Sequence, residues 1–230
     1  MNSVQNYIES IRIINSIQFE FTMWEESKIN LKKLFKVIPG PYWGILSMTI
    51  NILGVVIAIL MTPGYSINHM ISKLGYSPGA LFFNLGMILS GLFALIFYLY
   101  FVPILNNADI KVGLLRTALG LAISSCIFFI LVGVFPSIAN SYLELVHGVV
   151  SMLCLICGTM YKSLFGYLML KSKKFLKFHT YSAMIVVAIE VIFLLTWIPL
   201  IEWVMNFAII YWIFLLSFYV FAKKELRYFL

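Results

Sequence analysis

Residues 79–105 read GALFFNLGMILSGLFALIFYLYFVPIL and contain no charged side chain. This run is longer than the about 20 apolar residues that an α-helix needs to cross the hydrocarbon core of a bilayer. No water reaches the backbone in that core, so a helix is expected, because it bonds its own N–H and C=O groups. The stretch therefore predicts a transmembrane helix.

The rest of the chain has the same character. Of its 230 residues, 62% are hydrophobic and 11% are charged, whereas a soluble domain is about 25% charged. The mean hydropathy is +0.99. With turn-forming breaks such as Thr62-Pro63-Gly64, the pattern predicts an all-α integral membrane protein. We expect a six-transmembrane-helix bundle with spans at about 42–61, 80–105, 113–134, 145–170, 180–200 and 203–222.

Lysines and arginines lie almost entirely on one side of these spans. They precede the first span and follow the second, fourth and sixth, whereas the other loops together contain only Lys73. The positive-inside rule then places the N and C termini in the cytoplasm, and we expect the protein in the cell (plasma) membrane. Because these cations stand in short segments between apolar runs, they do not form the basic face that a nucleic-acid partner requires.

The two ends of the chain flank the membrane domain, residues 42–222. Residues 1–41 are expected to be a cytoplasmic segment and show no signal-peptide pattern. Residues 27–37 fit either a basic amphipathic helix on anionic inner-leaflet lipids or a solvated flank. Residues 223–230 form a basic cytoplasmic tail, which could contact the same lipids.

Apart from Arg116 near the start of the third span, two charged residues fall within predicted spans. Glu190 lies about halfway along the fifth span, and Lys162 lies at a similar depth in the fourth. At 1.5 Å per residue their depths differ by only about 5 Å, which long side chains can bridge. A structural intramembrane ion pair is the leading interpretation, and a proton- or substrate-linked role and a neutral or snorkelling arrangement remain open.

Two blocks carry a resemblance to a known family. Residues 65–91, YSINHMISKLGYSPGALFFNLGMILSG, and the sequence Gly133-Val134-Phe135-Pro136 followed by His147 are similar to the membrane family catalogued as domain of unknown function 998 (DUF998). The resemblance covers roughly residues 42–220. It implies a six-helix bundle and no established reaction.

Both blocks fall on the predicted outer face, where they supply the candidate site. The catalytic candidates are Ser66, His69, Ser72, Glu144 and His147, and the candidates for a binding pocket are Tyr65, Asn84, Phe135 and Pro136. Serine with histidine and a carboxylate could act as nucleophile, base and orienting group.

Evidence for a metal or cofactor is weak. Glu144 and His147 are three residues apart, a spacing used in carboxylate-bridged metal sites, and His69 could add a ligand from the same side. The cysteines Cys126, Cys154 and Cys157 fall in apolar segments and are expected to be buried fillers. We expect no cofactor and no resident metal, with His69, Glu144 and His147 as the only weak metal candidates.

Three functions are consistent with the sequence. The first is an uncharacterised membrane protein that binds a lipid, a small amphiphile or a membrane partner through the outer polar pocket, since catalytic groups are scarce. The second is a lipid-active hydrolase or transferase that uses the outer Ser/His/Glu cluster. The third is a small proton-coupled transporter centred on Glu190. The sequence favours a non-enzymatic protein and does not give its oligomeric state.

Overall fold

The computed structural model describes residues 33–106, 109–138, 141–172 and 174–223. The chain divides into two units, residues 1–39 with residue 230, and residues 40–229. In the first unit, residues 33–37 are helical. The remainder of the segment predicted as an amphipathic helix lies outside the described residues, as does the tail after Lys223.

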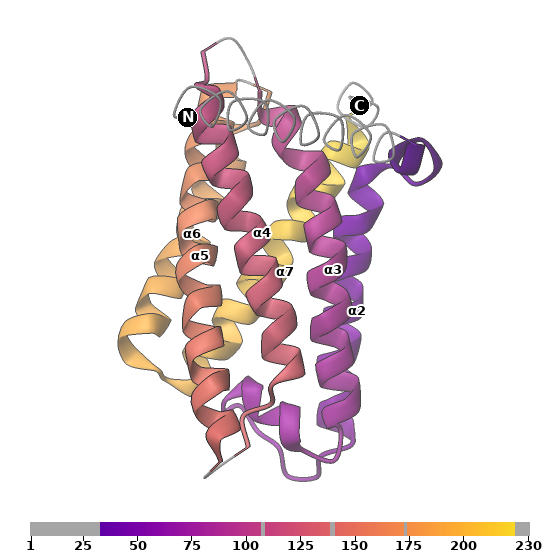
Figure 1. Cartoon of the computed structure of the whole chain (residues 1–230), viewed down its shortest axis with the longest axis vertical. Coiled ribbons are helices and arrows are strands. Elements are labelled where there is room, and N and C mark those ends of the chain that lie inside the picture. Colours follow the sequence, from indigo (N-terminus) through magenta and orange to yellow (C-terminus); the bar gives the residue numbers. More distant parts are fainter. Residues whose placement is uncertain (1–32, 107–108, 139–140, 173, 224–230) are drawn as a thin grey trace, which may run out of the picture. The chain divides into compact units, whose positions relative to one another are not determined.

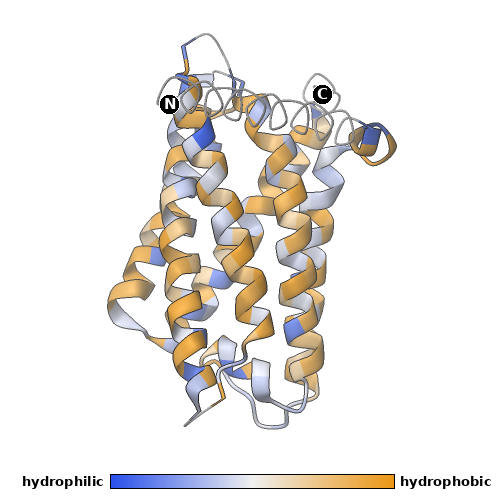
Figure 2. Ribbon diagram, in the orientation of Figure 1, coloured by the Kyte–Doolittle hydropathy of each residue, from blue (hydrophilic) through white to orange (hydrophobic). Residues whose placement is uncertain are grey.

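Within the described residues, six helices are long and apolar enough to cross a membrane (Figure 1). They are α2 (Gly40–Leu60), α3 (Ala80–Leu105), α4 (Val112–Val134), α5 (Tyr142–Ser172), α6 (Lys177–Thr196) and α7 (Pro199–Ala222). Figure 2 shows hydrophobic residues along the length of each helix and hydrophilic ones mainly near the ends. The predicted six-helix, all-α membrane class is confirmed.

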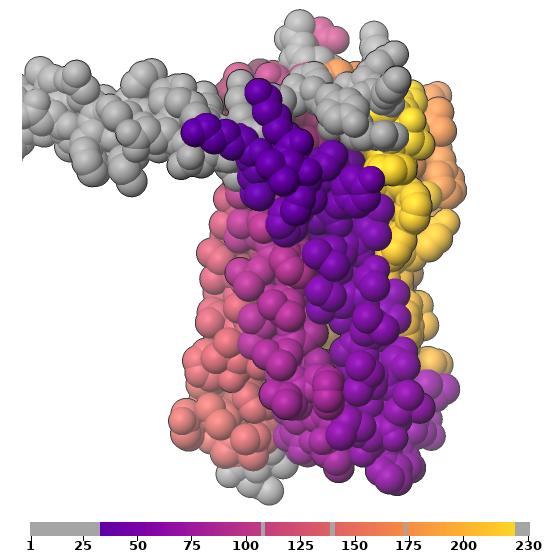
Figure 3. Space-filling model, turned by 90° about the vertical axis from the view of Figure 1, so that its right-hand side faces the viewer, coloured from indigo at the N-terminus to yellow at the C-terminus, as the bar shows by residue number. Residues whose placement is uncertain are grey.

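The helices of the second unit form a closed ring. Each helix packs against its neighbours in the chain, and α7 packs back against α2. Figure 3 shows α2 in indigo between α3 and the yellow α7. The short 3₁₀ helix η1 (Ile71–Tyr76) lies at one end, between α2, α3 and α7. We call this end, with the α2–α3, α4–α5 and α6–α7 connections, the loop end, and the opposite end the terminal end.

The α6–α7 turn differs from its prediction. We expected spans at 180–200 and 203–222, but α6 ends at Thr196 and α7 begins at Pro199. The first N–H group of a helix has no partner within the helix, so proline, which has no N–H, is favoured at this position. Proline also disfavours a helical conformation in the residue before it. Accordingly Ile198 is extended, and Trp197 takes a left-handed backbone with φ 52°.

At the terminal end, side chains bond to free backbone carbonyl groups. Lys174 Nζ donates to the carbonyl oxygens of Ile104, at 2.9 Å, and Asn106, at 3.1 Å, and so satisfies the C-terminal end of α3. Burial lowers the pKa of Lys174. The Tyr219 hydroxyl donates to the Lys174 carbonyl oxygen, at 2.7 Å. One of the lysines read as a topology signal is therefore also a helix cap.

Candidate functional site

Helices α5 and α6 are in close contact near the terminal end. The Thr180 hydroxyl donates to the backbone oxygen of Gly166, at 3.3 Å. A Cβ atom built on Gly166 would lie 2.3 Å from Met184 Cε and 3.5 Å from Ala183 Cβ. Small residues at such a point allow two membrane helices to approach each other. We call the line along which α5 faces α6 the α5–α6 seam.

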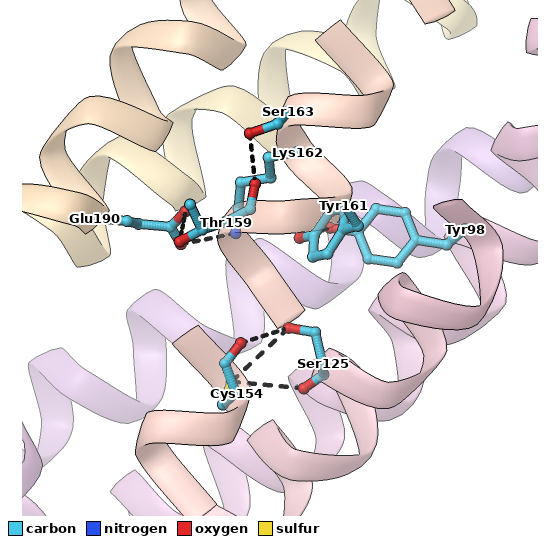
Figure 4. Close-up of polar contacts among 8 residues, drawn as sticks. All are labelled: Tyr98, Ser125, Cys154, Thr159, Tyr161, Lys162, Ser163 and Glu190. Carbon is cyan, nitrogen blue, oxygen red and sulfur yellow. Dashed lines mark hydrogen bonds and ion pairs between the residues drawn. The ribbon is translucent and has the colours of Figure 1, made fainter. Parts of the chain in front are cut away.

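A buried ion pair joins the same helices farther along. Lys162 Nζ of α5 lies 2.7 Å from Glu190 Oε1 of α6, with side-chain exposures of 3% and 1%. The Thr159 hydroxyl donates to the other carboxylate oxygen, at 3.3 Å (Figure 4). A Cβ atom on Gly158 would lie 3.0 Å from Lys162 Nζ, so glycine there leaves room for the ammonium group. The contact that the sequence predicted between Lys162 and Glu190 is therefore present, and the role of the pair stays a prediction.

The neighbouring residue, Tyr161, points from α5 toward α3 (Figure 4). Its hydroxyl lies 2.8 Å from that of Tyr98, and both rings are buried. On the loop side of this pair, the Ser125 hydroxyl donates to the Cys154 carbonyl oxygen at 3.1 Å, which joins α4 to α5. The midsection of the ring is therefore polar and internally bonded.

A small cavity of about 120 Å³ adjoins this polar midsection. Lys162, Glu190, Tyr98 and Tyr161 all contribute to its lining. The ion pair is thus hidden from lipid and still borders an internal space. A buried charged pair that lines a space can meet a ligand or water there, whereas a fully packed pair cannot.

A larger cavity of about 370 Å³ occupies the loop end of the ring. Its lining includes apolar side chains from α2, α3, α4, α5, α6 and α7, namely Val55, Phe83, Met87, Phe129, Val132, Leu155, Phe193 and Met205. Polar side chains also line it, namely Asn51, Ser72, Lys73, Ser137, Glu144, His147, Ser151, Glu202 and Asn206. We call it the loop-end cavity.

The two cavities share part of their lining, including Asn51 of α2 and Asn206 of α7. Asn51 Oδ1 and Asn206 Nδ2 are buried atoms without a hydrogen-bond partner. An unsatisfied buried polar atom costs about 1–3 kcal/mol. An acceptor and a donor therefore stand at the border between the cavities, where a ligand group could satisfy them.

The segment that covers the loop end is held by α7. One Glu202 carboxyl oxygen accepts the Ile71 N–H at 2.7 Å, and the other accepts the Ser72 N–H in a longer contact of 3.4 Å. These are the first N–H groups of η1, which have no partner within a short helix. Glu202, only 7% exposed, thus caps η1 from a distant part of the chain.

Aromatic residues hold the adjoining loop. The Trp203 indole N–H donates to the His69 carbonyl oxygen at 2.9 Å, and the Tyr65 ring lies against both residues. The Tyr65 hydroxyl donates to the carbonyl oxygen of Met70. Burial, and to a lesser degree the charge of Glu202, raises the pKa of Tyr65, so the hydroxyl stays protonated and keeps this bond.

The two family-like blocks meet at this end. The Asn84 side-chain amide donates to the Gly75 carbonyl oxygen at 3.0 Å. A Cβ atom built on Gly75 would lie 3.6 Å from Pro136 Cβ. The Phe135 carbonyl oxygen accepts a bond of 2.7 Å from His147 Nδ1, which therefore carries the ring proton. His147 Nε2 remains as the hydrogen-bonding atom of a residue that lines the cavity.

The sequence-derived candidates separate into two groups. Ser72, Glu144 and His147 line the loop-end cavity. Tyr65, Ser66, His69, Asn84, Phe135 and Pro136 instead hold the loops around it or stand in them.

Catalysis by a Ser–His pair and metal binding both require the histidines to lie close to the other candidate residues. The Ser66 hydroxyl and His69 Nδ1 are 3.3 Å apart in an exposed contact. No three or more His, Cys, Asp or Glu side chains of the described residues are grouped so that they could hold a metal ion. His69, Glu144 and His147 are therefore not brought together as a ligand set.

The site residues that sequence reasoning missed include Trp197, Glu202 and Asn206. A single signal could have found the last two. Pro199 marks the first turn of a helix, which would have placed Glu202 inside that helix and Asn206 on the same face one turn later. The predicted span at 203–222 instead left Glu202 in a connection.

These features define a class: an integral membrane protein whose six-helix ring encloses a buried ion pair and a cavity at the loop end. The chain belongs to the family described as "Protein of unknown function (DUF998)", whose family model matches residues 45–219. The resemblance found in the sequence is thereby confirmed, and both blocks lie within the matched region. No curated protein and no solved structure matches the chain.

Proposed function

We propose that the protein binds a single-chain amphiphile, or one acyl chain of a membrane lipid, in the loop-end cavity. The observation that carries this proposal is a largely apolar cavity of about 370 Å³ with polar groups at its borders. Sites for small ligands measure about 300–1,000 Å³ and combine apolar walls with a few polar groups that fix orientation. The cavity is near the lower limit, which favours one chain over a whole two-chain lipid.

The polar groups suggest how such a ligand would be oriented. Ser72, Lys73 and Glu144 stand where the cavity meets the loop end and could contact a head group. Asn51 and Asn206 stand at the opposite border and could bond a carbonyl or hydroxyl group. The apolar walls between them match a hydrocarbon chain.

The proposal includes the orientation of the protein in the plasma membrane. The lysine distribution supports a loop end that faces outward and termini that face the cytoplasm. Ser66→Cys should react in intact cells with a thiol reagent that does not cross membranes, whereas Lys223→Cys should react only after permeabilisation. The reverse labelling pattern would contradict this orientation.

Native mass spectrometry of the protein released from phospholipid nanodiscs tests the binding. The wild-type protein should retain one lipid or single-chain amphiphile. Val132→Trp, which places a large ring in the cavity wall, should lose it. Val134→Trp is the matched control, since Val134 lies two residues away and is exposed. An empty wild-type protein, or equal retention by both variants, would contradict the proposal.

A second candidate, proton-coupled transport, is supported by the ion pair at the smaller cavity. Lys162 and Glu190 border a space that shares lining residues with the loop-end cavity. In proteoliposomes with an internal pH dye, a proton flux that disappears in the double variant Lys162→Met, Glu190→Leu would support this function. A flux that the double variant leaves unchanged, or no flux, would count against it.

A further inference from the structure

A groove of about 680 Å³ lies on the outside of α5 at the loop end. Its lining includes Leu145 and Val149, which are 72% and 52% exposed, and Trp197. In a membrane-spanning helix, such exposed apolar residues face hydrocarbon. Figure 1 shows the α6–α7 turn standing to one side of the loop-end half of α5.

The groove and the loop-end cavity share three lining residues. Glu144, Gly148 and Trp197 border both spaces, so they form the wall that separates the cavity from lipid. Gly148 has no side chain, and a Cβ atom built on it would meet nothing within 4 Å. The wall is therefore thin at this point of the α5–α6 seam.

Gly166 provides an internal comparison on the same helix. It lies 18 residues from Gly148, which is five full turns at 3.6 residues per turn, so both glycines face the same side of α5. At Gly166 the seam is in contact, with Met184, Ala183 and Thr180 within 4 Å of an added Cβ atom. The two helices thus approach each other near the terminal end and leave open space at the loop end.

Trp197 completes the border with a strained backbone. Its φ of 52° and ψ of 30° lie in the left-handed region, which a bulky residue rarely adopts. Its N–H bonds the Phe193 carbonyl oxygen at 2.8 Å, so it ends α6 in the position where glycine is usual. Glycine would avoid this strain, so a tryptophan at this position points to a role for the ring.

We propose that the loop-end part of the α5–α6 seam is a lateral opening through which an acyl chain passes from the surrounding leaflet into the loop-end cavity. This inference rests on the proposed function, because it gives the cavity's ligand its route. The head group stays at the bilayer surface, and only the chain passes between Gly148 and Trp197. The alternative route, from the aqueous side, is covered by η1, which Glu202 and Asn84 hold in place.

The rate of ligand exchange tests the opening separately from binding. The probe is palmitoyl lysophosphatidylcholine, bound to the full chain in phosphatidylcholine nanodiscs and exchanged for its deuterated form, with both forms followed by native mass spectrometry. Gly148→Trp should slow exchange at least about tenfold, because its ring fills the open space beside Trp197. Gly148 also lines the cavity, so the final occupancy is measured separately from the exchange rate. Gly120→Trp is the matched control, since an added Cβ atom there also meets nothing within 4 Å.

Trp197→Gly gives the opposite test and does not depend on the first variant folding. It removes the ring and the backbone strain together, so exchange should become faster than in the wild-type protein. Equal exchange rates in the wild type, Gly148→Trp and Trp197→Gly would overturn the lateral opening. A lower occupancy at an unchanged rate in Gly148→Trp would overturn it as well. If the wild-type protein does not bind the probe or any lipid, the proposed function fails instead.

Discussion

Each half of the α5–α6 seam contains a glycine of α5, but α6 is in contact with α5 at only one of them. Near the terminal end, Gly166 brings α5 against Thr180 and Ala183 of α6. At the loop end, Gly148 faces open space, and α6 presents the rings of Phe193 and Trp197 to the cavity. The ion pair Lys162–Glu190 stands between these halves. A glycine on the face of one helix therefore allows the neighbouring helix to come into contact or leaves open space beside it, according to the size of the residues opposite.

The largest effect should come from breaking the ion pair that separates the halves. Lys162→Ala leaves the Glu190 carboxylate buried without its partner, which typically costs about 3–5 kcal/mol of unfolding free energy. We expect a large fall in the amount of folded, monodisperse protein and in its thermal midpoint in detergent. Size-exclusion chromatography and thermal denaturation measure both.

The double variant Lys162→Met, Glu190→Leu is the control for this prediction. Replacing both charges removes the uncompensated group, so most of the lost stability should return. A double variant as unstable as Lys162→Ala would contradict a purely electrostatic origin of the loss.

Enlarging the two glycines sharpens the comparison directly. Gly166→Leu forces a side chain into the closed half of the seam and should cost about 1–3 kcal/mol. Gly148→Leu, on the same face five turns away, should change the thermal midpoint little, because its side chain enters open space. Equal losses at both positions would show that the seam is closed along its whole length.

Loosening η1, which lies over the loop-end cavity, should lower the free energy of unfolding by a smaller amount. Glu202→Ala removes the acceptor of the Ile71 and Ser72 N–H groups, and we expect a loss of about 1–2 kcal/mol. Hydrogen exchange measured by mass spectrometry should show faster exchange in η1, whereas α5 near Lys162 should keep its protection. Unchanged protection of η1 would contradict the capping role.

Tyr65→Phe should have the smallest effect, about 1 kcal/mol, through the lost bond to the Met70 carbonyl oxygen. Because burial raises the pKa of Tyr65, the folded state holds the phenol proton more tightly than the unfolded state. Its contribution to stability is therefore present below pH about 10 and declines as the pH rises further. Thermal midpoints between pH 8 and 11 should show a weaker alkaline decline in Tyr65→Phe than in the control Tyr76→Phe.

The architecture could be predicted from the sequence because hydropathy and turn-forming residues determine each membrane helix from its own stretch of chain. Uncharged runs such as residues 79–105 and turn residues such as Pro63 and Gly64 determine where helices begin and end without reference to other helices. The pairing of Lys162 with Glu190 was also accessible, because depth in the membrane follows from helical rise. The α6–α7 turn was misplaced, because Pro199 starts a helix inside an apolar run that reads as continuous, and α5 and α6 each begin three residues before the predicted spans.

The cavity could not be predicted in the same way. Its existence depends on how far six helices stand apart, which follows from side-chain packing across the ring and leaves no periodic pattern. Asn206 and Glu202 become site residues only because α7 turns one face toward η1 and the loop-end cavity. The convergence of Asn84, Pro136 and His147 was anticipated on the outer face, but the individual bonds required the structure.

Photo-crosslinking from inside the ring tests most directly whether the cavity holds an acyl chain. Leu155, which lines both cavities, would be replaced by p-benzoylphenylalanine and irradiated in native membranes. Mass spectrometry should find one lipid or fatty acyl group attached at this position, with less attachment when Val132→Trp is added. Crosslinks only within the protein, or lipid attachment that Val132→Trp leaves unchanged, would contradict the account.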